Sequence, residues 1–255
     1  MPLANFNLKD KVAIVTGASR GIGEAIARGL AENDATVIIC SRKQETLDEV
    51  AASISADTGA KCIGIACHTG DPAAIDALFN RVKDEFGRCD ILVNNAATNP
   101  YFGPAVDMEM GAFDKTFEVN VKGYFLMCQR AGRMMVEQGS GSMINVASIA
   151  GISPGAMQGC YSMTKAAVIS MTKVFAKELG SANVRCNAIC PGVVETKFAQ
   201  VLIDTPEIYD QFIKTIPMAR HAQPSEMVGL AVYLASDASS YTTGTAMVSD
   251  GGMII

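Results

Sequence analysis

Apolar residues along the chain follow two alternating patterns. Short runs rich in β-branched residues, typical of buried parallel strands, separate longer stretches with the apolar spacing of amphipathic helices. The runs that predict strands are residues 11–16, 36–40, 61–66, 90–93, 141–147, 183–189 and 244–248. The stretches that predict helices are residues 24–33, 44–58, 72–86, 114–137, 158–179 and 224–236. This alternation favours a single α/β domain over residues 1–255, a doubly wound parallel sheet (Rossmann fold) with helices on both faces.

A glycine-rich turn follows the first predicted strand. Gly17, Gly21 and Gly23 have the spacing G-x-x-x-G-x-G and lead directly into the first predicted helix. Glycine lets the backbone approach a pyrophosphate, and a helix N-terminus offers free N–H groups, so this context favours a dinucleotide site. A plain turn is the alternative. The intervening residues expected to share the site are Ser19, Arg20 and Ile22.

The end of the second predicted strand indicates which dinucleotide binds. NAD sites commonly place a carboxylate here, against the ribose 2′-hydroxyl. This chain instead has Ser41, Arg42 and Lys43. Arg42, together with Arg20 from the glycine turn, could hold a 2′-phosphate because guanidinium groups match phosphate oxygens. NADP(H) is therefore favoured over NAD(H). Two alternatives stay open: the cations merely solvate a strand exit, or Glu45 serves the ribose of NAD.

Tyr161 and Lys165 are the candidate reactive residues. Their i,i+4 spacing puts both side chains on one face of a predicted helix. A free phenol has a pKa near 10, and a neighbouring ammonium favours the phenolate and moves that pKa toward neutrality. Ser148 directly follows a predicted strand and could hold a carbonyl oxygen together with the tyrosine. Taken alone, Tyr-x-x-x-Lys recurs by chance in helices, and Ser148 could simply cap a loop.

Composition narrows the classes of function. The 255 residues include 21 basic and 26 acidic side chains, and the formal charge of −5 argues against nucleic acid or an anionic membrane as partner. The eight cysteines form no C-x-x-C pair and there are only two histidines, so a metal site is not expected. No stretch approaches the roughly 18 apolar residues of a membrane span. The first residues lack a signal-peptide core, so a cytoplasmic protein with reduced cysteines is expected.

Taken in order, these features resemble the classical short-chain dehydrogenase/reductase family over nearly the whole chain. The motifs that carry the resemblance are Thr16-Gly17-x-x-x-Gly21-Ile22-Gly23, Asn94-Asn95-Ala96-Ala97, Asn120, Ser148, Tyr161-x-x-x-Lys165 and Pro191-Gly192. Each motif is modest alone, but six in the right order are highly specific. The resemblance implies an enzyme that transfers hydride between a nicotinamide and a ketone, aldehyde or secondary alcohol.

The resemblance also implies roles for single residues. Tyr161 would be the general acid–base, Ser148 would hold the carbonyl oxygen, and Lys165 would lower the pKa of the tyrosine and bind the nicotinamide ribose. Asn120 would hold a water that links Lys165 to solvent. Further cofactor contacts would come from Asn95, Ala96, Pro191, Gly192, Val194 and Thr196.

Within the family, the stretches around Arg42, His68 and Asn94 look like NADP-dependent carbonyl reductases that act on retinal and other ketones. One departure concerns His68, which stands where many members have an aspartate that accepts a hydrogen bond from adenine. His68 would stack on the adenine or donate to it instead. The chain ends at Ile255 without a Ser-Lys-Leu address, so a peroxisomal location is not expected.

Residues 195–222 are polar, interrupted by proline and weakly periodic, and we expect them to form a mobile lid that sets specificity. Met157 and Met218 are expected to flank the substrate, whereas His221 is expected to be a solvated loop residue. A hydrophobic or aromatic carbonyl substrate is predicted from the apolar residues of the lid, which are Tyr209, Phe212, Ile213 and Met218.

Three rival functions stay open. Reduction of a 3-oxoacyl thioester on an acyl carrier protein would need a basic patch near the cleft, which Arg130 and Arg133 could supply. An NAD-dependent secondary alcohol dehydrogenase is the second rival. A catalytically silent nucleotide-binding regulator is disfavoured, because the serine, tyrosine and lysine are all present. The resemblance further implies a homotetramer that packs the long helices at 107–137 and 158–180 across two-fold axes.

Overall fold

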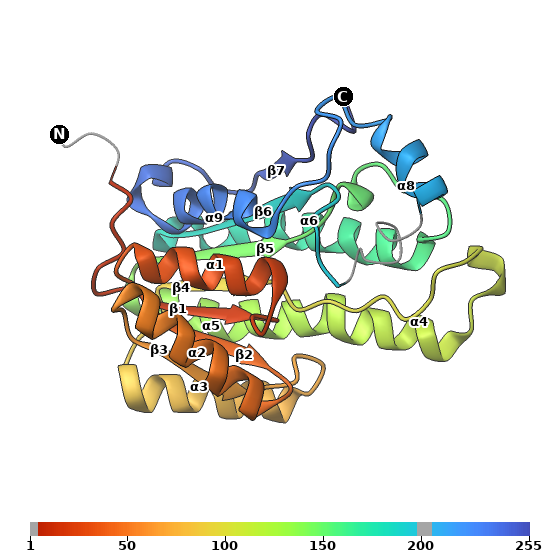
Figure 1. The fold of residues 1–255 in the computed structure, drawn as a ribbon. Coiled ribbons are helices and arrows are strands. Elements are labelled where there is room, and N and C mark those ends of the chain that lie inside the picture. Colours follow the sequence, from red (N-terminus) through yellow and green to blue (C-terminus); the bar gives the residue numbers. More distant parts are fainter. Residues whose placement is uncertain (1–4, 198–205) are drawn as a thin grey trace.

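A seven-stranded parallel sheet forms the centre of the computed structural model, which describes residues 5–197 and 206–255 (Figure 1). The strand order β3-β2-β1-β4-β5-β6-β7 shows that the chain begins in the middle of the sheet and winds outward in both directions. The strands are β1 Val12–Thr16, β2 Thr36–Ser41, β3 Cys62–Ala66, β4 Ile91–Asn94, β5 Gly141–Val146, β6 Val184–Pro191 and β7 Ala246–Ser249. The predicted doubly wound parallel sheet is confirmed.

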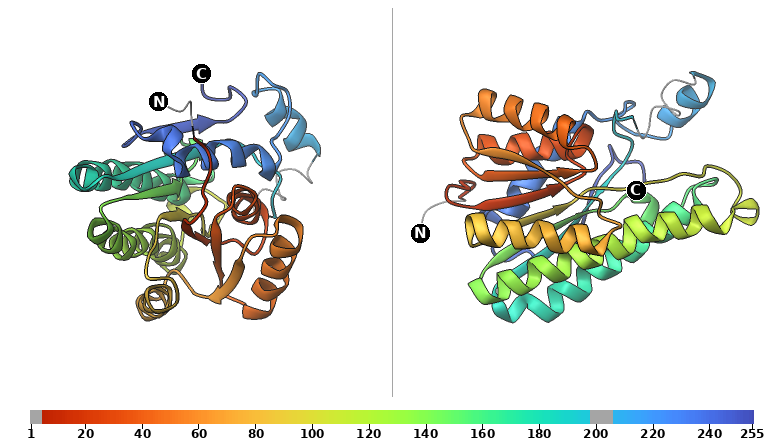
Figure 2. Two further views of the ribbon diagram at one scale, coloured as in Figure 1. Left: turned by 90° about the vertical axis from the view of Figure 1, so that its left-hand side faces the viewer. Right: turned by 90° about the horizontal axis from the view of Figure 1, so that it is seen from below.

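Helices cover both faces of this sheet (Figure 2). In the described part of the chain they are α1 Gly21–Glu32, α2 Gln44–Thr58, α3 Pro72–Phe86, α4 Met110–Phe117, α5 Tyr124–Gln138, α6 Gly159–Leu179, α8 Pro206–Ile213 and α9 Val228–Ala235. Short 3₁₀ turns occupy Ala105–Asp107, Ile149–Gly151, Gly180–Ala182, Pro224–Met227 and Asp237–Ser239.

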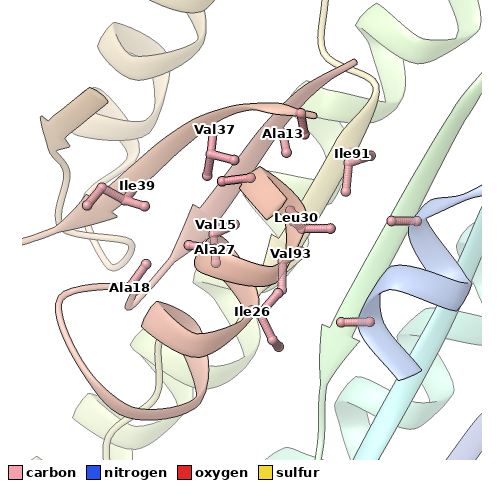
Figure 3. Close-up of a cluster of buried hydrophobic side chains, with 14 of the residues drawn as sticks. Ala13, Val15, Ala18, Ile26, Ala27, Leu30, Val37, Ile39, Ile91 and Val93 are labelled. Carbon is pink, nitrogen blue, oxygen red and sulfur yellow. The ribbon is translucent and has the colours of Figure 1, made fainter. Parts of the chain in front are cut away.

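Alternation along the strands explains the two helical layers. Ala13 and Val15 of β1 pack with α1, α2 and α9 on one face, where Figure 3 shows them beside side chains of α1. Val12 and Ile14, the intervening residues of the same strand, pack with α3, α5 and α6 on the other face. Because successive side chains of a strand point to opposite faces, a strand covered on both sides must be apolar throughout.

The long helix predicted over residues 114–137 differs most from the structure. It begins earlier, as α4, and a π-helical turn at Glu118–Gly123 separates α4 from α5. A Cβ on Gly123 would lie 2.3 Å from the carbonyl oxygen of Thr69, so this turn packs directly against the loop that follows β3. π-Helical turns inside α-helices are frequent at functional sites. This one carries Asn120.

The predicted lid is partly helical. Residues 206–213 form α8, which lies beyond the carboxyl edge of the sheet and apart from the two helical layers (Figures 1 and 2). The rest of the segment is tied to the end of β6 by a parallel bridge between Val194 and Ala222. Residues 198–205 of the predicted lid lie outside the described residues, so its mobility stays a prediction.

The eight cysteines are all free thiols and all buried, so they pack as small apolar side chains. Among the helices of residues 5–197 and 206–255, none combines the length and the hydropathy that crossing a membrane requires.

Candidate active site

The glycine turn between β1 and α1 brings backbone segments into close contact. Gly17 and Gly21 have φ angles of +64° and +62°, which residues with a side chain rarely adopt. A Cβ on Gly17 would lie 2.7 Å from the Cα of Ala96, and one on Gly23 would lie 2.5 Å from the carbonyl oxygen of Gly17. The turn therefore presents backbone, not side chains, at the N-terminus of α1. Two further predicted cofactor residues are partly buried in it, namely Ser19 and Ile22.

Asn95 and Ala96 hold this turn in place from the end of β4. Nδ2 of Asn95 donates to the carbonyl oxygens of Thr16 and Gly17, both at 3.1 Å. Oγ1 of Thr16 accepts from the backbone N–H of Asn95 at 2.9 Å and of Ala96 at 3.1 Å. Both residues thus shape the cradle itself, and the amide hydrogens of Asn95 are already used. Their predicted contact with a cofactor stays a prediction.

Arg20 and Arg42 lie at the carboxyl ends of neighbouring strands. Arg20 immediately precedes α1 after β1, and Arg42 follows Ser41, the last residue of β2, which pairs with β1. Both arginines are exposed, and neither takes part in an ion pair within the described residues. Two exposed cations, neither of them paired with a carboxylate of residues 5–197 or 206–255, therefore lie at the edge where the adenosine ribose is expected.

His68 is a partly buried residue of the loop after β3, where the adenine is expected. Its Nδ1 accepts a hydrogen bond from the backbone N–H of Gly70 at 3.0 Å, which in a neutral imidazole places the proton on Nε2. A Cβ on Gly70 would lie 2.3 Å from Oε1 of Glu118, so the loop packs tightly against the π-helical turn. His68 thus has an N–H donor available for a ligand.

Tyr161 and Ser148 meet at the carboxyl edge of the sheet. Burial raises the pKa of Tyr161 to about 12, and a hydrogen bond with Ser148 acts in the opposite direction. Oγ of Ser148 also accepts from the backbone N–H of Ala150 at 3.1 Å, so this serine caps the turn that follows β5. The Tyr–Lys spacing predicts that the pKa of the phenol moves toward neutrality. The structure gives the opposite direction, because the effect of burial on this pKa is larger than that of the hydrogen bond with Ser148.

Lys165 is fully buried one helical turn after Tyr161 on α6. Its Nζ donates to the carbonyl oxygen of Val146 at 2.7 Å and lies 5.5 Å from the ring centroid of Tyr161. Burial lowers the pKa of Lys165 to about 7, so the ammonium and the neutral amine are both populated near neutral pH. A Cβ on Gly151 would lie 2.6 Å from the backbone of Lys165, so a glycine lets the Ser148 turn approach this helix.

Asn120 is fully buried in the π-helical turn and does not face solvent. Its Oδ1 accepts from the backbone N–H of Thr98 at 2.8 Å. Its Nδ2 donates to the carbonyl oxygen of Thr98 at 2.9 Å and to Oγ1 of Thr164 at 3.2 Å. Both amide hydrogens are used, so the predicted water would have to bind the second lone pair of Oδ1 or the main chain.

The segment after β6 lies over the glycine turn. Pro191 is buried and ends β6. Val194, in the segment that follows, is also buried and forms the bridge to Ala222. A Cβ on Gly21 would lie 3.2 Å from Cγ2 of Thr196. Backbone from the loop after β7 packs closely against Gly192. The structure thus brings this predicted nicotinamide segment to the glycine turn.

A chain of hydrogen bonds in the lid was not predicted from the sequence. The hydroxyl of Tyr209 on α8 lies 2.5 Å from Nδ1 of His221, and Nε2 of His221 lies 3.1 Å from Oε2 of Glu195. Gln223 donates to the same carboxylate oxygen at 2.6 Å. His221 is therefore a partly buried link between α8 and the segment after β6, and its interpretation as a solvated residue is wrong. We call Tyr209, His221 and Glu195 the lid clasp.

Met157 and Met218, expected beside the substrate, are exposed by 42% and 59%. Met157 also has a φ of +67°, uncommon for a residue with a side chain, and its carbonyl oxygen accepts from the backbone N–H of Gly103 at 2.9 Å. The hydroxyl of Tyr101 donates to the carbonyl oxygen of Pro104 at 2.9 Å. The loop after β4 is thus joined to the turn before α6.

Known proteins with similar sequences and structures agree with this geometry. The family model described as Enoyl-(Acyl carrier protein) reductase matches residues 17–254. The chain is 38% identical to Dehydrogenase/reductase SDR family member 4 of Oryctolagus cuniculus, over 98% of this chain and 94% of that protein. It is 39% identical to D-threitol dehydrogenase of Mycolicibacterium smegmatis, over 98% and 95%. A gluconate 5-dehydrogenase from Burkholderia cenocepacia, solved with NADP and tartrate, has a TM-score of 0.94 and 31% identity, covering 98% and 97% of the two chains.

The sheet, its glycine turn and the buried tyrosine and lysine together define a nucleotide-dependent oxidoreductase. The chain belongs to the short-chain dehydrogenase/reductase family. It is accordingly an enzyme that uses a nicotinamide cofactor and acts on CH–OH groups.

Proposed function

We propose that this enzyme transfers hydride between NADP(H) and a ketone, aldehyde or secondary alcohol, with Tyr161 as the general acid–base. The observation that carries the proposal is the cluster of Ser148, Tyr161 and Lys165 at the same carboxyl edge of the sheet as the glycine turn. A silent nucleotide-binding regulator would have no need to keep a fully buried lysine next to a buried tyrosine, because burying an ammonium is costly.

The cradle around the glycine turn fits a dinucleotide, since side chains at Gly17 and Gly23 would collide with backbone. The pyrophosphate would lie on the N-terminus of α1, and the nicotinamide would lie against the segment after β6. Bound there, the nicotinamide supplies or accepts the hydride. The residues that would hold the cofactor are Gly17, Ser19, Arg20, Gly21, Ile22, Gly23, Ser41, Arg42, His68, Asn95, Ala96, Tyr161, Lys165, Pro191, Gly192, Val194 and Thr196.

Proton transfer is the part of the reaction that the protein performs. During reduction Tyr161 donates its phenolic proton to the carbonyl oxygen while Ser148 donates a hydrogen bond to the same atom. The resulting phenolate needs a nearby positive charge, which the ammonium of Lys165 provides. With a lysine pKa of about 7, this support is present at lower pH and is lost as pH rises through that value. We therefore expect reduction, which consumes a proton and forms this phenolate, to be fastest below about pH 7 and to slow as the ammonium is lost.

Arg20 and Arg42 are exposed and form no ion pair within the described residues, which supports NADP(H) over NAD(H), because each could form charge-assisted hydrogen bonds with a 2′-phosphate. Titration of the purified protein with NADPH and NADH tests this preference directly. Arg42→Ala should weaken NADPH by about 10- to 100-fold and NADH by much less. Lys43→Ala, which removes the neighbouring exposed cation, is the matched control. An equal loss for both cofactors in Arg42→Ala would contradict phosphate recognition and favour the NAD-dependent alternative.

A hydrophobic carbonyl is our first candidate for the substrate, supported by the exposed Met157 and Met218. The relatives named for threitol and gluconate favour a second candidate, a polyhydroxy secondary alcohol. Turnover of an aromatic ketone with NADPH, measured beside turnover of D-threitol with NADP⁺ and NAD⁺, separates the two. Failure with every carbonyl and alcohol of both classes would argue against the proposed activity.

Reduction of a 3-oxoacyl thioester has support from the matched family description, but less from the surface. Arg130, one of the two predicted carrier contacts, is engaged by Asp76 on α3, with Nε and Oδ1 2.6 Å apart. Only Arg133 of the pair is exposed. A carrier-bound substrate should therefore gain little over the same acyl group on a small thiol.

We further propose a homotetramer in the cytoplasm. Apolar side chains of α5 and α6, namely the exposed Val136 together with Phe175 and Leu179, line a groove of about 360 Å³ between these helices. A second copy that covers this groove would bury them. The eight free thiols support a reducing compartment. Light scattering on the purified protein tests the oligomeric state.

A further inference from the structure

Lys165 is a buried cation with few partners. Its side chain is 1% exposed, and no carboxylate within the described residues forms an ion pair with it. A buried charge is costly unless something nearby compensates it. One compensating group is the carbonyl oxygen of Val146 at 2.7 Å. The second is an aromatic side chain from another helix.

That aromatic side chain is Tyr124, the first residue of α5 after the π-helical turn. Its ring centroid lies 5.2 Å from Nζ of Lys165, which is within the range of a cation–π interaction and closer than the ring of Tyr161 at 5.5 Å. The hydroxyl of Tyr124 donates to the carbonyl oxygen of Val146 at 3.1 Å. One carbonyl therefore accepts from both Lys165 and Tyr124, as its two lone pairs allow.

We propose that Tyr124 is a positioning residue for Lys165: the face of its ring stabilises the buried ammonium that donates to the Val146 carbonyl. The proposal rests on the function assigned to Lys165 above. Burial holds the pKa of Tyr124 well above its ordinary value, so the hydroxyl keeps the proton that it donates. The ring stays neutral, and its negative face attracts the lysine without competing for its proton.

Few other titratable groups face this lysine. Tyr161 approaches it from α6 itself, and Cys190 approaches from β6, where the lysine charge favours the thiolate. Burial raises the pKa of Cys190 to about 11, so this thiol stays neutral near pH 7. Cys128 interacts with Tyr124 on α5. With Cys190 and both tyrosines neutral, the groups of the described residues that favour a charged Lys165 are the Val146 carbonyl and the two tyrosine rings, of which the ring of Tyr124 is the nearer.

The test measures the protonation of Lys165 directly, by ¹³C NMR of the lysine Cε in the protein without cofactor. The Lys165 signal is the one that disappears in Lys165→Met. Tyr124→Met removes the ring and should lower the lysine pKa by about one unit. Tyr124→Phe keeps the ring and should leave the pKa within about 0.3 units of the unmodified protein. Phe125→Met, a ring removed from the exposed neighbouring position, should change nothing.

An unchanged pKa in Tyr124→Met, or an equal shift in Tyr124→Phe, would overturn the proposal. If Tyr124→Met does not fold, 3,5-difluorophenylalanine at position 124 keeps the shape of the ring and weakens its negative face, and the same downward shift is expected. The alkaline limb of kcat/KM for 4-nitrobenzaldehyde reduction with NADPH should move down in parallel. A shifted lysine pKa without any turnover would leave the positioning role intact and instead contradict the proposed function.

Discussion

The buried cluster of Ser148, Tyr161 and Lys165, for which we propose a catalytic role, and the lid clasp place polar groups in opposite ways. Tyr161 and Lys165 are buried at the edge of the sheet, where Tyr161 is hydrogen-bonded with Ser148 and Lys165 donates to the carbonyl oxygen of Val146. The lid clasp joins side chains across a partly exposed surface, where the carboxylate of Glu195 is half accessible. Burial raises the pKa of Tyr161 and lowers the pKa of Lys165. In the clasp, hydrogen bonds from Gln223 and His221 lower the pKa of Glu195.

Because of this difference, the reactivity of the buried groups and the position of α8 depend on different interactions. In the buried cluster, the reactivity of each group depends on how completely the fold excludes water, so small cavities or lost rings change the chemistry. In the clasp, water can compete for the hydrogen bonds that hold α8. Substitutions there should therefore alter the predicted lid and leave Tyr161 and Lys165 unchanged. Substitutions in the two regions should therefore affect different measurable quantities.

The largest effect is expected at Tyr161. Tyr161→Phe removes the proton donor while keeping the ring, and turnover should fall by about 10³- to 10⁴-fold, at the upper end of what general acid–base catalysis contributes. NADPH binding, followed by fluorescence titration, should stay within about threefold of the unmodified protein because the ring still packs in place. Substantial turnover in this variant would remove the acid–base assignment.

Lys165→Met should make the protein more stable near neutral pH. The folded pKa of about 7 lies below the ordinary value of 10.5, so the buried ammonium costs stability most below pH 7. That cost is relieved as pH rises from 7 toward 10.5, because the folded state then holds the lysine neutral. The variant should therefore melt on the order of 5 °C higher at pH 6, with the gain shrinking toward pH 10.5.

The control for this prediction is Lys173→Met, an exposed position on the same helix. Across the same pH range, this variant should melt at nearly the same temperature as the unmodified protein. A gain in Lys165→Met that is constant with pH would show that better apolar packing, and not the buried charge, is responsible.

His221→Ala should break the lid clasp with little effect on the fold. The global melting temperature should change by less than about 2 °C, because partly exposed polar contacts contribute little. Limited proteolysis within residues 206–213 should become faster, since α8 loses its link to the segment after β6. KM for the substrate should rise more than kcat falls. Lys214→Ala, just after α8, is the control, and equal protease sensitivity in both variants would argue against the clasp.

Glu195→Gln should have the smallest effect of the series. The amide oxygen can still accept from Gln223 and His221, so the hydrogen-bonded chain persists without its charge. We expect proteolysis of α8 to stay close to that of the unmodified protein at pH 7. A change as large as in His221→Ala would show that the charge of Glu195, not the hydrogen bonding, secures the lid.

The sheet was accessible from the sequence because strands buried on both faces must be apolar throughout, as β1 and β2 are. The neighbouring positions of Tyr161 and Lys165 were accessible because an i,i+4 pair is a local property of one helix. The effect of burial on the two side chains, which raises the pKa of Tyr161 and lowers that of Lys165, could not be predicted from the spacing. The pKa of a phenol depends on every element packed around it, and burial at this site raises the pKa of Tyr161 where the spacing alone predicts the reverse.

Features that depend on distant contacts were missed for the same reason. The π-helical turn interrupts a continuous helical pattern, and Gly123 within it fits against Thr69, a contact that no local pattern reveals. The ring of Tyr124 meets Lys165 across two helices, and in the sequence it looks like an ordinary core residue. The lid clasp joins three residues from separate segments.

The π-helical turn has a consequence for redesigning the adenine contact proposed for this enzyme. One of its faces packs against the loop of His68 and Gly70, and its buried side carries Asn120, which is hydrogen-bonded to Thr164 of α6. A substitution that reshapes the loop of His68 and Gly70 would push on the same turn that supports α6, the helix of Tyr161 and Lys165. Redesign of the adenine contact is therefore a coupled problem, in which the loop after β3 and the turn at Glu118–Gly123 have to be varied together.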